Sequence, residues 1–427
     1  MFILRPFAYL PLLMKLKPDS YAHVDNDGRL VIPQEIAFCY GFKPGAVVPL
    51  NEAEQNITLR LPPTHLKKVY IEPTNRCNLA CRMCIRRTWD EPLGRMAQNI
   101  FKRILEGLRD FTPTPSIVFG GFGEPLSHPD IVEMVEEAKH LKAQVELITN
   151  ATLLSEDLAR SLVAARLDVL WVSIEGAKTA SYADVRLGGE LTTVLDNIRR
   201  FRDSRQAYRT DIGVVFVAMK RNVHELPAVI QLAKDLGANR FLVTNVLPYT
   251  EELCAETLYT CEPIHETNPF LNLNNSFELC KMDFNEATNT PLQTIIRHAS
   301  ILRDTATNAG MMQNYCPFIE GGSVAICWDG RVSPCLPLMH THTSFLRDRK
   351  RLTKCFHVGS IADQRLKEIW NSAVNIAFRR RIQAFMFASC TSCKGCELAE
   401  KNETDCLGNG FPSCGGCLWA QGYIRCP

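Results

Sequence analysis

An alternation of strand-like and helix-length segments between residues 68 and 246 constrains the fold of this chain more than any other feature. Short runs rich in β-branched and other apolar residues read as strands. There are six of them, KKVYIEPT, PSIVFGG, QVELIT, DVLWVSIE, DIGVVFVAM and RFLVTNVL. Amphipathic segments such as HPDIVEMVEEAKHLK and SEDLARSLVAAR separate the strands and read as helices. Strands that alternate with helices form parallel sheets, so we expect an α/β fold.

We expect the six βα units, residues 66–248, to curve into a partial (β/α)6 TIM-like barrel. In such folds the functional residues lie at the carboxyl ends of the strands. The polar residues that follow each strand in the sequence are therefore the first candidates for a site.

The segments on either side of this core follow other patterns. Residues 21–62 read as short strands around a short helix, and their GRLVIP and YGFKPG resemble AbrB-like swapped-hairpin modules. No basic cluster accompanies the motif, which favours a homodimer or partner docking over nucleic acid as its role. Residues 1–20 are an N-terminal extension, 249–315 a connector of mixed structure, and 316–427 a cysteine-rich domain.

Charge and composition narrow the partners and the compartment. Lys and Arg number 48 against 46 Asp and Glu, a formal net charge of +2, which gives no global reason to expect nucleic acid or a membrane surface. The opening MFILRPFAYLPLLMKLKPDS is too short to span a bilayer, is interrupted by Pro11, and lacks a small-residue cleavage site. We therefore favour a cytoplasmic protein, starting at Met1 or Met14, over a secreted one. A reducing compartment favours metal thiolates over disulfides for its eighteen cysteines.

Three cysteines follow the first expected strand at a spacing that leaves a metal site open. The stretch NRCNLACRMC places Cys77, Cys81 and Cys84 at CxxxCxxC spacing. Three thiolates can bind three irons of a [4Fe-4S] cluster and leave the fourth iron without a protein ligand. A zinc site is the alternative, but closed zinc sites pair a CxxC with a second ligand pair, which is absent nearby. An open iron implies a ligand that reacts there.

This motif resembles the cluster loop of the radical S-adenosylmethionine (SAM) superfamily. The resemblance implies that SAM fills the fourth iron position, and that reduction of this catalytic cluster cleaves SAM to a 5'-deoxyadenosyl radical. It also implies that GGFGEP, through Gly121, Gly123 and Glu124, holds the methionine ammonium group. Further SAM-binding residues implied by the resemblance are Met83, Asn150, Ser173, Glu175 and Arg186.

Four of these residues have an expected partner on SAM. Ser173 and Glu175 would bind the ribose hydroxyls, and Arg186 the carboxylate. Met83 stands where the family usually has an aromatic residue beside the adenine, and Met is adaptable enough for that pocket. Ala151 and Glu175 stand where the family more often has Gly and Asp.

The cysteine-rich domain resembles a second known module. Its opening CPFIEGGSVAICWDGRVSPC resembles the SPASM extension, which holds two auxiliary [4Fe-4S] clusters. Motif order implies Cys316, Cys335 and Cys417 for the first cluster, with a fourth ligand from Cys327 or Cys280. The second cluster would take two of Cys390, Cys393 and Cys396, together with Cys414 and Cys426. An insertion that carries Cys406 leaves the assignment open, and a zinc ribbon is the alternative for the domain.

The combined motifs predict a radical SAM maturase. The whole chain, from GRLVIP to CGGCLWAQGYIRCP, resembles the maturases associated with tungsten-containing aldehyde ferredoxin oxidoreductases. The resemblance implies a protein, peptide or cofactor substrate and a low-potential electron donor such as ferredoxin. A ribosomal-peptide or sulfatase maturase is the alternative among enzymes.

Two alternatives belong to other classes of protein. A multicluster electron carrier has no need of GGFGEP or SIEGA, and failure to bind SAM would favour it. A redox-sensing regulator would use the AbrB-like module on DNA, and salt-dependent, sequence-dependent binding would support it.

Overall fold

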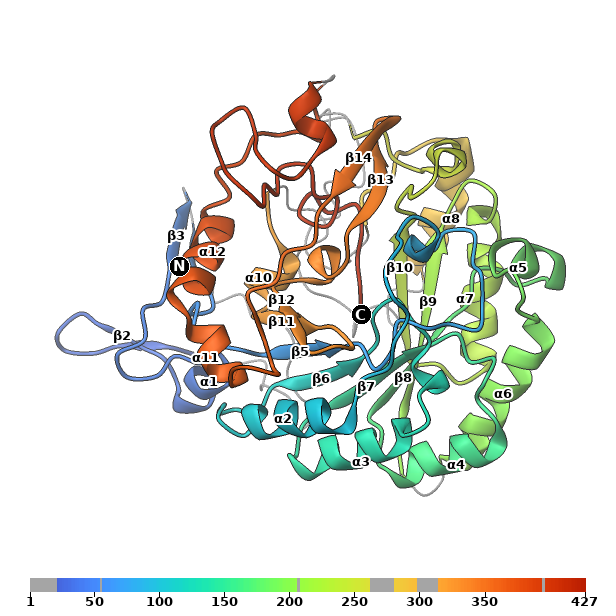
Figure 1. Cartoon of the computed structure of the whole chain (residues 1–427), viewed down its shortest axis with the longest axis horizontal. Helices are drawn as coiled ribbons and strands as arrows, with labels where there is room; N and C mark the ends of the chain where they lie inside the picture. The colour runs from blue at the N-terminus through green and yellow to red at the C-terminus, as the bar shows by residue number, and fades with distance from the viewer. Residues whose placement is uncertain (1–20, 54–55, 206–207, 262–279, 298–313, 394–395) are drawn as a thin grey trace.

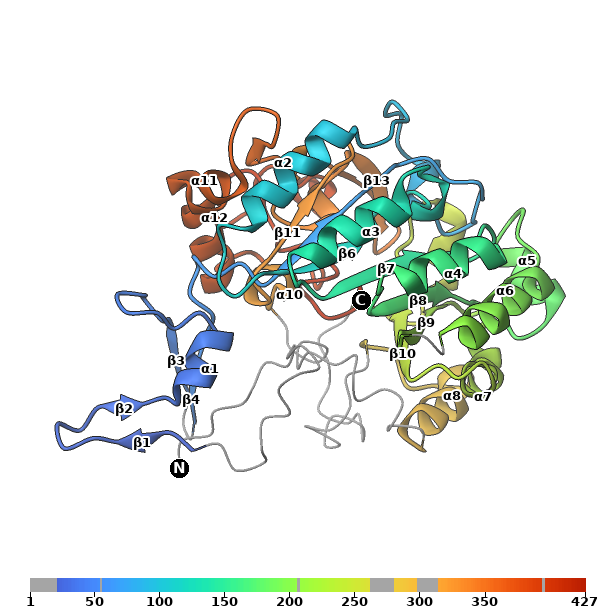
Figure 2. The same ribbon diagram turned by 90° about the horizontal axis from the view of Figure 1, so that it is seen from below.

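The computed structural model describes residues 21–53, 56–205, 208–261, 280–297, 314–393 and 396–427 (Figures 1 and 2). Its centre is a nine-stranded sheet in the order β10-β9-β8-β7-β6-β5-β11-β12-β15. Six of these strands are parallel, and each pairs with the strand that precedes or follows it in the sequence. They are β5 (Lys68–Ile71), β6 (Ser116–Phe119), β7 (Val145–Thr149), β8 (Val169–Ser173), β9 (Asp211–Ala218) and β10 (Arg240–Asn245). All six lie where the sequence pattern predicted strands, and the α/β class is confirmed.

Helices cover one face of the six parallel strands, on the outside of the curve that the sheet makes in Figure 1. They are α2 (Gln98–Leu108), α3 (Ile131–His140), α4 (Glu156–Ala164), α5 (Thr179–Val185), α6 (Leu191–Ser204) and α7 (Leu226–Asp235). Each of the longer ones presents an apolar stripe to the sheet, as Phe101, Ile104 and Leu108 do on α2. The inner face is thereby left for other contacts.

Alternation along β5 shows how its two faces are used. Val69 and Ile71 are buried in the large core under the helices, whereas Tyr70 is buried in a second core that it shares with the C-terminal region. Successive side chains of a strand point to opposite faces, so both faces of this strand are covered. This explains why its sequence is apolar throughout.

The C-terminal region extends the same sheet rather than forming a separate one. β11 (Ser323–Ile326) pairs in parallel with β5, and β12 (Arg331–Ser333) and β15 (Gly359–Ser360) continue in antiparallel fashion. The remaining elements of this region are α10 (Pro317–Glu320), η6 (Leu336–Leu338), β13 (His342–Leu346), β14 (Arg349–Thr353), α11 (Leu366–Asn371), α12 (Ala373–Ala384) and η7 (Glu397–Glu400). Because β11 occupies the free side of β5, the described sheet is open at β10 and not closed on itself.

The N-terminal module lies at one side of the molecule in Figures 1 and 2. It consists of two short antiparallel hairpins and a one-and-a-half-turn helix: β1 (His23–Val24), β2 (Leu30–Val31), α1 (Gln34–Cys39), β3 (Leu50–Ala53) and β4 (Asn56–Leu59). Short strands around a short helix were predicted here. The AbrB likeness and a swapped dimer stay predictions.

The connector contributes few described elements. They are η4 (Glu251–Glu256) and α8 (Glu286–Arg297), and α8 packs on α7. The N-terminal extension, residues 1–20, and positions 262–279 and 298–313 of the connector lie outside the described residues. Across the part of the chain that is described, none of the helices has the length and apolar character needed to cross a membrane.

Candidate functional site: a cysteine loop and a thiol-lined pocket

The three cysteines of the CxxxCxxC motif lie on the loop between β5 and η1 (Ile85–Arg87). Burial raises the pKa of Cys84 to about 11, and the neighbouring Cys81 and Cys77 thiols add to the increase. Burial likewise raises the pKa of Cys77. The three sulfur atoms are therefore close enough to interact electrostatically, and their thiolates need a compensating positive charge, which iron would supply.

Backbone hydrogen bonds fix this loop against the chain that follows α5. The Ala80 N–H donates to the Leu187 carbonyl at 3.1 Å, and the Arg82 N–H donates to the Val185 carbonyl at 3.0 Å. The cysteine loop is thus hydrogen-bonded, on either side of Cys81, to the segment that contains Val185 and Leu187.

The GGFGEP loop after β6 packs directly on the cysteine loop. The Glu124 N–H donates to the Arg76 carbonyl at 2.7 Å. A Cβ at Gly123 would lie 2.0 Å from the Thr74 carbonyl oxygen, and Gly121 has a φ of +101°. Glycine is therefore required at both positions, one for close approach and one for its backbone angle.

Glu124 is buried, and its side chain links the glycine-rich loop to the end of β7. Its Oε1 accepts from the Thr149 hydroxyl at 2.6 Å and from the Leu126 N–H at 2.9 Å, and its Oε2 accepts from the Asn150 N–H at 2.8 Å. Burial raises the pKa of Glu124, and these hydrogen bonds oppose the increase. An ionised carboxylate can accept about four hydrogen bonds, so one acceptor position remains for a ligand.

Two other polar side chains contact the sulfur atoms. The Asn150 amide donates to Cys77 Sγ at 3.9 Å, and the Arg186 guanidinium donates to Cys81 Sγ at 3.7 Å. Arg186 also pairs with Glu175 through two hydrogen bonds, of which Nη2 to Oε1 measures 2.6 Å, and both side chains are buried. The sequence predicted that Arg186 and Glu175 would each bind SAM, but it carried no signal that they bind each other.

The remaining predicted residues of this site lie at its margins. Ser173 ends β8 and is half-buried, and Met83 is half-buried against the apolar cluster of Met219 and Val246. Ala151 adopts φ +58°, a left-handed angle in which the glycine common in the family costs less. The candidate site is thus built from the cysteine loop after β5 and from residues at the carboxyl ends of β6, β7 and β8.

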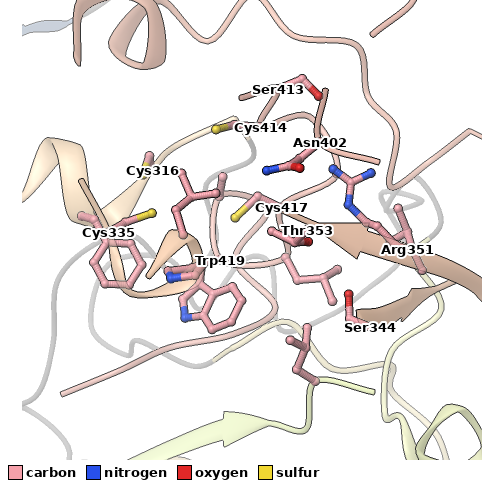
Figure 3. A pocket seen from close by; sticks show the side chains of 18 of the residues that line it. Cys316, Cys335, Ser344, Arg351, Thr353, Asn402, Ser413, Cys414, Cys417 and Trp419 are labelled. Carbon is pink, nitrogen blue, oxygen red and sulfur yellow. The ribbon is translucent and has the colours of Figure 1, made fainter. Parts of the chain in front are cut away.

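A pocket in the C-terminal region is lined by four cysteines, Cys316, Cys335, Cys414 and Cys417, whose side chains surround one space (Figure 3). Burial raises the pKa of Cys335, and the thiols of the other three contribute next. Apolar side chains complete most of the wall. Sequence order placed Cys414 in the second cluster, whereas the structure places it with the residues predicted for the first.

The physical reason is that Cys414 and Cys417 lie on one tight turn, in which the Cys417 N–H donates to the Cys414 carbonyl at 3.0 Å. A Cβ at Gly415 would lie 1.9 Å from the Ala388 carbonyl oxygen, and one at Gly416 would lie 2.9 Å from the Arg351 guanidinium carbon. The two glycines let the turn sit close to both groups, so that its two cysteines face the same pocket.

Arg351 lies between two groups of cysteines. Burial lowers its pKa, and the thiols of Cys390, Cys417 and Cys414 oppose that decrease. Its guanidinium also donates to the Ala399 carbonyl. A buried cation at this position offsets part of the negative charge that clustered thiolates carry.

Cys390 interacts with a second set of cysteines. Burial raises its pKa, and Cys406 and Cys396 are among the neighbours that add to the increase. Cys393 is exposed and belongs to the same CTSCKGC stretch. Cys406, to which the sequence assigned no role, is thus near enough to Cys390 to raise its pKa.

Cys426 does not line the pocket of the four cysteines, but it contacts Trp419, which does. The Trp419 indole N–H donates to its Sγ at 3.4 Å, and burial raises its pKa to about 11. The sequence grouped Cys426 with Cys390, and that grouping stays a prediction. The last residues instead run along the inner face of the sheet, where the Tyr70 hydroxyl donates to the Pro427 carbonyl at 2.6 Å.

Comparison with known families agrees with both parts of the site. A sequence model of the radical SAM superfamily matches residues 71–244, and one of an iron–sulfur cluster-binding domain (SPASM) matches residues 316–397. The crystal structure of Streptococcus suis SuiB bound to S-adenosylmethionine has a similar fold, with a TM-score of 0.53 and 15% identity over 78% of this chain and 71% of that one.

Two curated relatives extend the comparison. The tungsten-containing aldehyde ferredoxin oxidoreductase cofactor-modifying protein of Pyrococcus furiosus is 30% identical over 369 residues, which cover 85% of this chain and 97% of that protein. The AdoMet-dependent heme synthase of Methanosarcina barkeri is 30% identical over 179 residues, 42% of this chain and 50% of that protein. With the cysteine loop, the glycine-rich loop and the thiol-lined pocket in place, the chain belongs to the radical SAM superfamily, in one family with the Pyrococcus protein, and is an enzyme that binds SAM and iron–sulfur clusters.

Proposed function

We propose that this enzyme modifies a cofactor, peptide or protein during maturation of a tungsten-containing aldehyde ferredoxin oxidoreductase. One observation carries the proposal: the likeness to the Pyrococcus protein of that name spans 97% of its length, well beyond the radical SAM core. A likeness confined to the core would favour the general reaction without favouring a particular substrate.

The site residues have defined roles in this proposal. Cys77, Cys81 and Cys84 would bind three irons of one cluster. When bound, the cluster and SAM supply reductive cleavage of the sulfonium and a 5'-deoxyadenosyl radical. Glu124 would accept from the methionine ammonium with its remaining acceptor position, and Ser173 would bind a ribose hydroxyl.

The buried ion pair of Arg186 and Glu175 supports a second role for each residue besides binding SAM. Because its guanidinium already reaches Cys81 Sγ, Arg186 would stabilise negative charge on the cluster as well as orient the SAM carboxylate. Glu175 would hold that guanidinium in place and present its remaining acceptor positions to the ribose.

We assign two auxiliary clusters from the positions of the thiols. The first would use Cys316, Cys335, Cys414 and Cys417, which line one pocket. The second would use Cys390, Cys393, Cys396 and Cys406, since Cys390 interacts with Cys396 and Cys406. Auxiliary clusters beside a radical site suit a reaction that returns an electron after hydrogen abstraction, with a low-potential ferredoxin as electron donor.

The N-terminal module offers a surface for a large partner or a second copy of the chain. Several of its apolar side chains are exposed, among them Tyr21, Val24, Val47 and Leu50. Exposed apolar groups that gather on one small module are typical of interaction surfaces.

The proposal is tested by producing a tungsten aldehyde oxidoreductase with and without this enzyme. We expect the oxidoreductase made without it to bind metal yet lack full activity or a covalent change in its cofactor or active-site peptide. Mass spectrometry of both is the deciding measurement. Identical masses with equal activity would contradict the proposal and favour a ribosomal-peptide or sulfatase maturase.

A further inference from the structure

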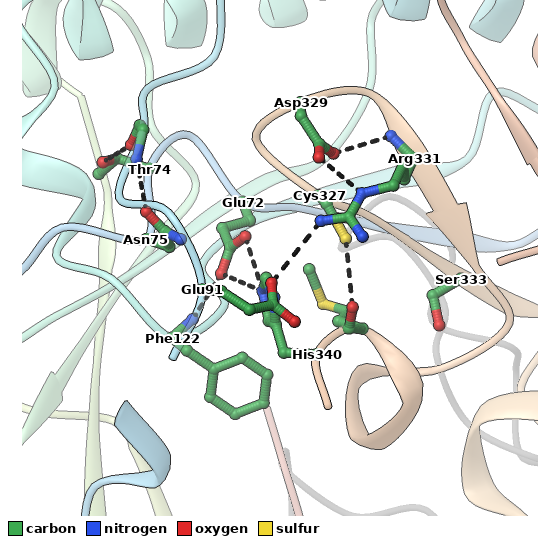
Figure 4. A network of polar contacts seen from close by, with 12 residues as sticks. Glu72, Thr74, Asn75, Glu91, Phe122, Cys327, Asp329, Arg331, Ser333 and His340 are labelled. Carbon is green, nitrogen blue, oxygen red and sulfur yellow. Dashed lines mark hydrogen bonds and ion pairs between the residues drawn. The ribbon is translucent and has the colours of Figure 1, made fainter. Parts of the chain in front are cut away.

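Three buried side chains with metal-ligating atoms meet at the junction of β5 and β11 (Figure 4). They are Glu72, Cys327 and His340, and the ligating atoms all lie within 4.8 Å of one another. Among the described residues this is the only such group of His, Cys, Asp or Glu side chains. Each of the three residues is fully buried.

The pairing of two distant strands creates this group. Ile71 is the register partner of Ile326, and the Glu72 N–H donates to the Ile326 carbonyl at 2.9 Å. Glu72 and Cys327 are the next residues along the two parallel strands, so they leave the sheet side by side. His340 reaches them from the chain that follows η6.

His340 is held in an orientation typical of a metal ligand. Its Nδ1 lies 2.6 Å from Glu91 Oε2, and its Nε2 lies 3.1 Å from Glu72 Oε2. Metal-binding histidines commonly donate their other ring N–H to a carboxylate, which fixes the tautomer and the ring. The rings of Trp89 and Phe122 pack edge-on against the imidazole at 4.3 and 5.8 Å between centroids.

The other two groups are also fixed. Glu72 Oε1 accepts from the Phe122 N–H at 3.1 Å, and a Cβ at Gly121 would lie 2.9 Å from Glu72 Cβ. Cys327 Sγ lies 3.8 Å from the Met339 carbonyl oxygen and 3.9 Å from His357 Nε2. Glu72 therefore sits directly behind the glycine-rich loop of the SAM site.

An ion pair alone accounts for only part of this arrangement. A protonated His340 between Glu72 and Glu91 would account for the two carboxylates, and the Cys327 thiol adds a third metal-ligating group within 4.8 Å of the same atoms. Cys327 is not needed in the four-cysteine pocket, which already holds four thiols. Sulfur, imidazole nitrogen and carboxylate oxygen are together the ligand types of zinc sites.

We propose that Glu72, Cys327 and His340 bind one Zn²⁺ ion, in a mononuclear site separate from the iron–sulfur clusters. Three protein ligands leave the fourth tetrahedral position open, as in zinc sites that bind water or a substrate group. Glu91 acts as a positioning residue, because it touches the far nitrogen of His340 and not the metal.

The test measures zinc and iron in the anaerobically purified enzyme with its clusters intact, after loading with one equivalent of Zn²⁺ and gel filtration. We expect about one zinc per chain in the wild type and less than about a tenth of that in Cys327→Ser, with iron unchanged. Cys355→Ser is the matched control, since Cys355 is a half-buried thiol of the same region, and it should retain zinc. Absence of zinc from the wild type, or full retention in Cys327→Ser, would overturn the proposal.

Two further measurements distinguish this zinc site from zinc bound in a cysteine cluster and from a buried ion pair. X-ray absorption at the zinc edge should give one sulfur ligand with nitrogen and oxygen ligands, and an all-sulfur environment would place the zinc in a cysteine cluster and overturn the site. Glu91→Gln should keep zinc but weaken its affinity about 10- to 100-fold. An affinity unchanged in both Glu91→Gln and Glu72→Gln would leave only the buried ion pair.

Discussion

The cysteine loop after β5 and the thiol-lined pocket of the C-terminal region both gather cysteines, but the groups that surround the thiols differ. At the loop, three thiols are joined by polar side chains from neighbouring strand ends, and Asn150 and Arg186 both donate to sulfur. At the pocket, four thiols are enclosed mainly by apolar groups, with Arg351 as the nearby cation. If the two sites hold the clusters proposed for them, the difference fits their roles: a cluster that binds a ligand needs polar groups around it, whereas one that carries electrons needs shielding and charge compensation.

The largest effect on activity is expected from loss of the three loop cysteines. Replacing Cys77, Cys81 and Cys84 by Ala removes the open iron, so reductive cleavage of SAM should fall to the background rate. The clusters of the C-terminal region should remain, so iron should fall from about twelve to about eight per chain. Production of 5'-deoxyadenosine under dithionite measures the first effect, and its persistence in the triple variant would contradict the site.

A pair of single variants sharpens the description of the pocket. Cys414→Ala should lower iron by about four per chain, because it removes a ligand from the four-thiol pocket. Cys426→Ala should leave iron unchanged, since neither of the two ligand sets proposed above uses Cys426. Anaerobic iron and sulfide analysis distinguishes the two, and a loss of about four irons in both variants would restore the grouping expected from sequence order.

The polar surround of the loop is tested at Glu124. Glu124→Gln removes a charged acceptor worth about 1.5 to 3 kcal/mol, so SAM should bind about ten- to a hundred-fold more weakly. The amide nitrogen also cannot accept from Thr149 or Asn150, which would disturb the strand ends. Titration of SAM into the enzyme gives the dissociation constant, and the cluster absorption spectrum should be that of the wild type. Equal affinity would remove Glu124 from the site.

The smallest effect is expected at the margin of the loop site. Ser173→Ala should weaken SAM binding by about 1 kcal/mol, roughly five-fold, because one neutral hydrogen bond to the ribose is lost. The same titration provides the measurement. A larger loss than that of Glu124→Gln would mean that the ribose contacts, rather than the ammonium contact, dominate binding.

The sequence predicted the six strands and the cysteine loop because both are local. Alternation of side chains over a few residues identifies a strand, and the CxxxCxxC motif can be read from one short stretch of sequence. GGFGEP and SIEGA could be placed at one edge of the sheet because the carboxyl ends of parallel strands meet there.

The grouping of the distant cysteines could not be predicted in the same way. Whether Cys414 lies with Cys335 or with Cys390 depends on where the CGGC turn packs in the folded chain, which no spacing records. The pairing of Glu175 with Arg186 is likewise a matter of which groups face each other once the loops have folded. The meeting of Glu72 with Cys327 required the register of β5 and β11.

The continuation of the sheet from β5 onto β11 has a consequence for how the chain folds. The residues that cover the free edge of β5 lie about 250 positions later in the sequence. A parallel pairing between such distant segments is slow to form, because the entropy cost of closing the long loop comes before the favourable contacts are made. Until the C-terminal region has been synthesised, β5 presents an unpaired edge to other chains. The isolated core, which lacks β11, is therefore expected to aggregate, and any fragment that protects this edge must extend at least through Ile326.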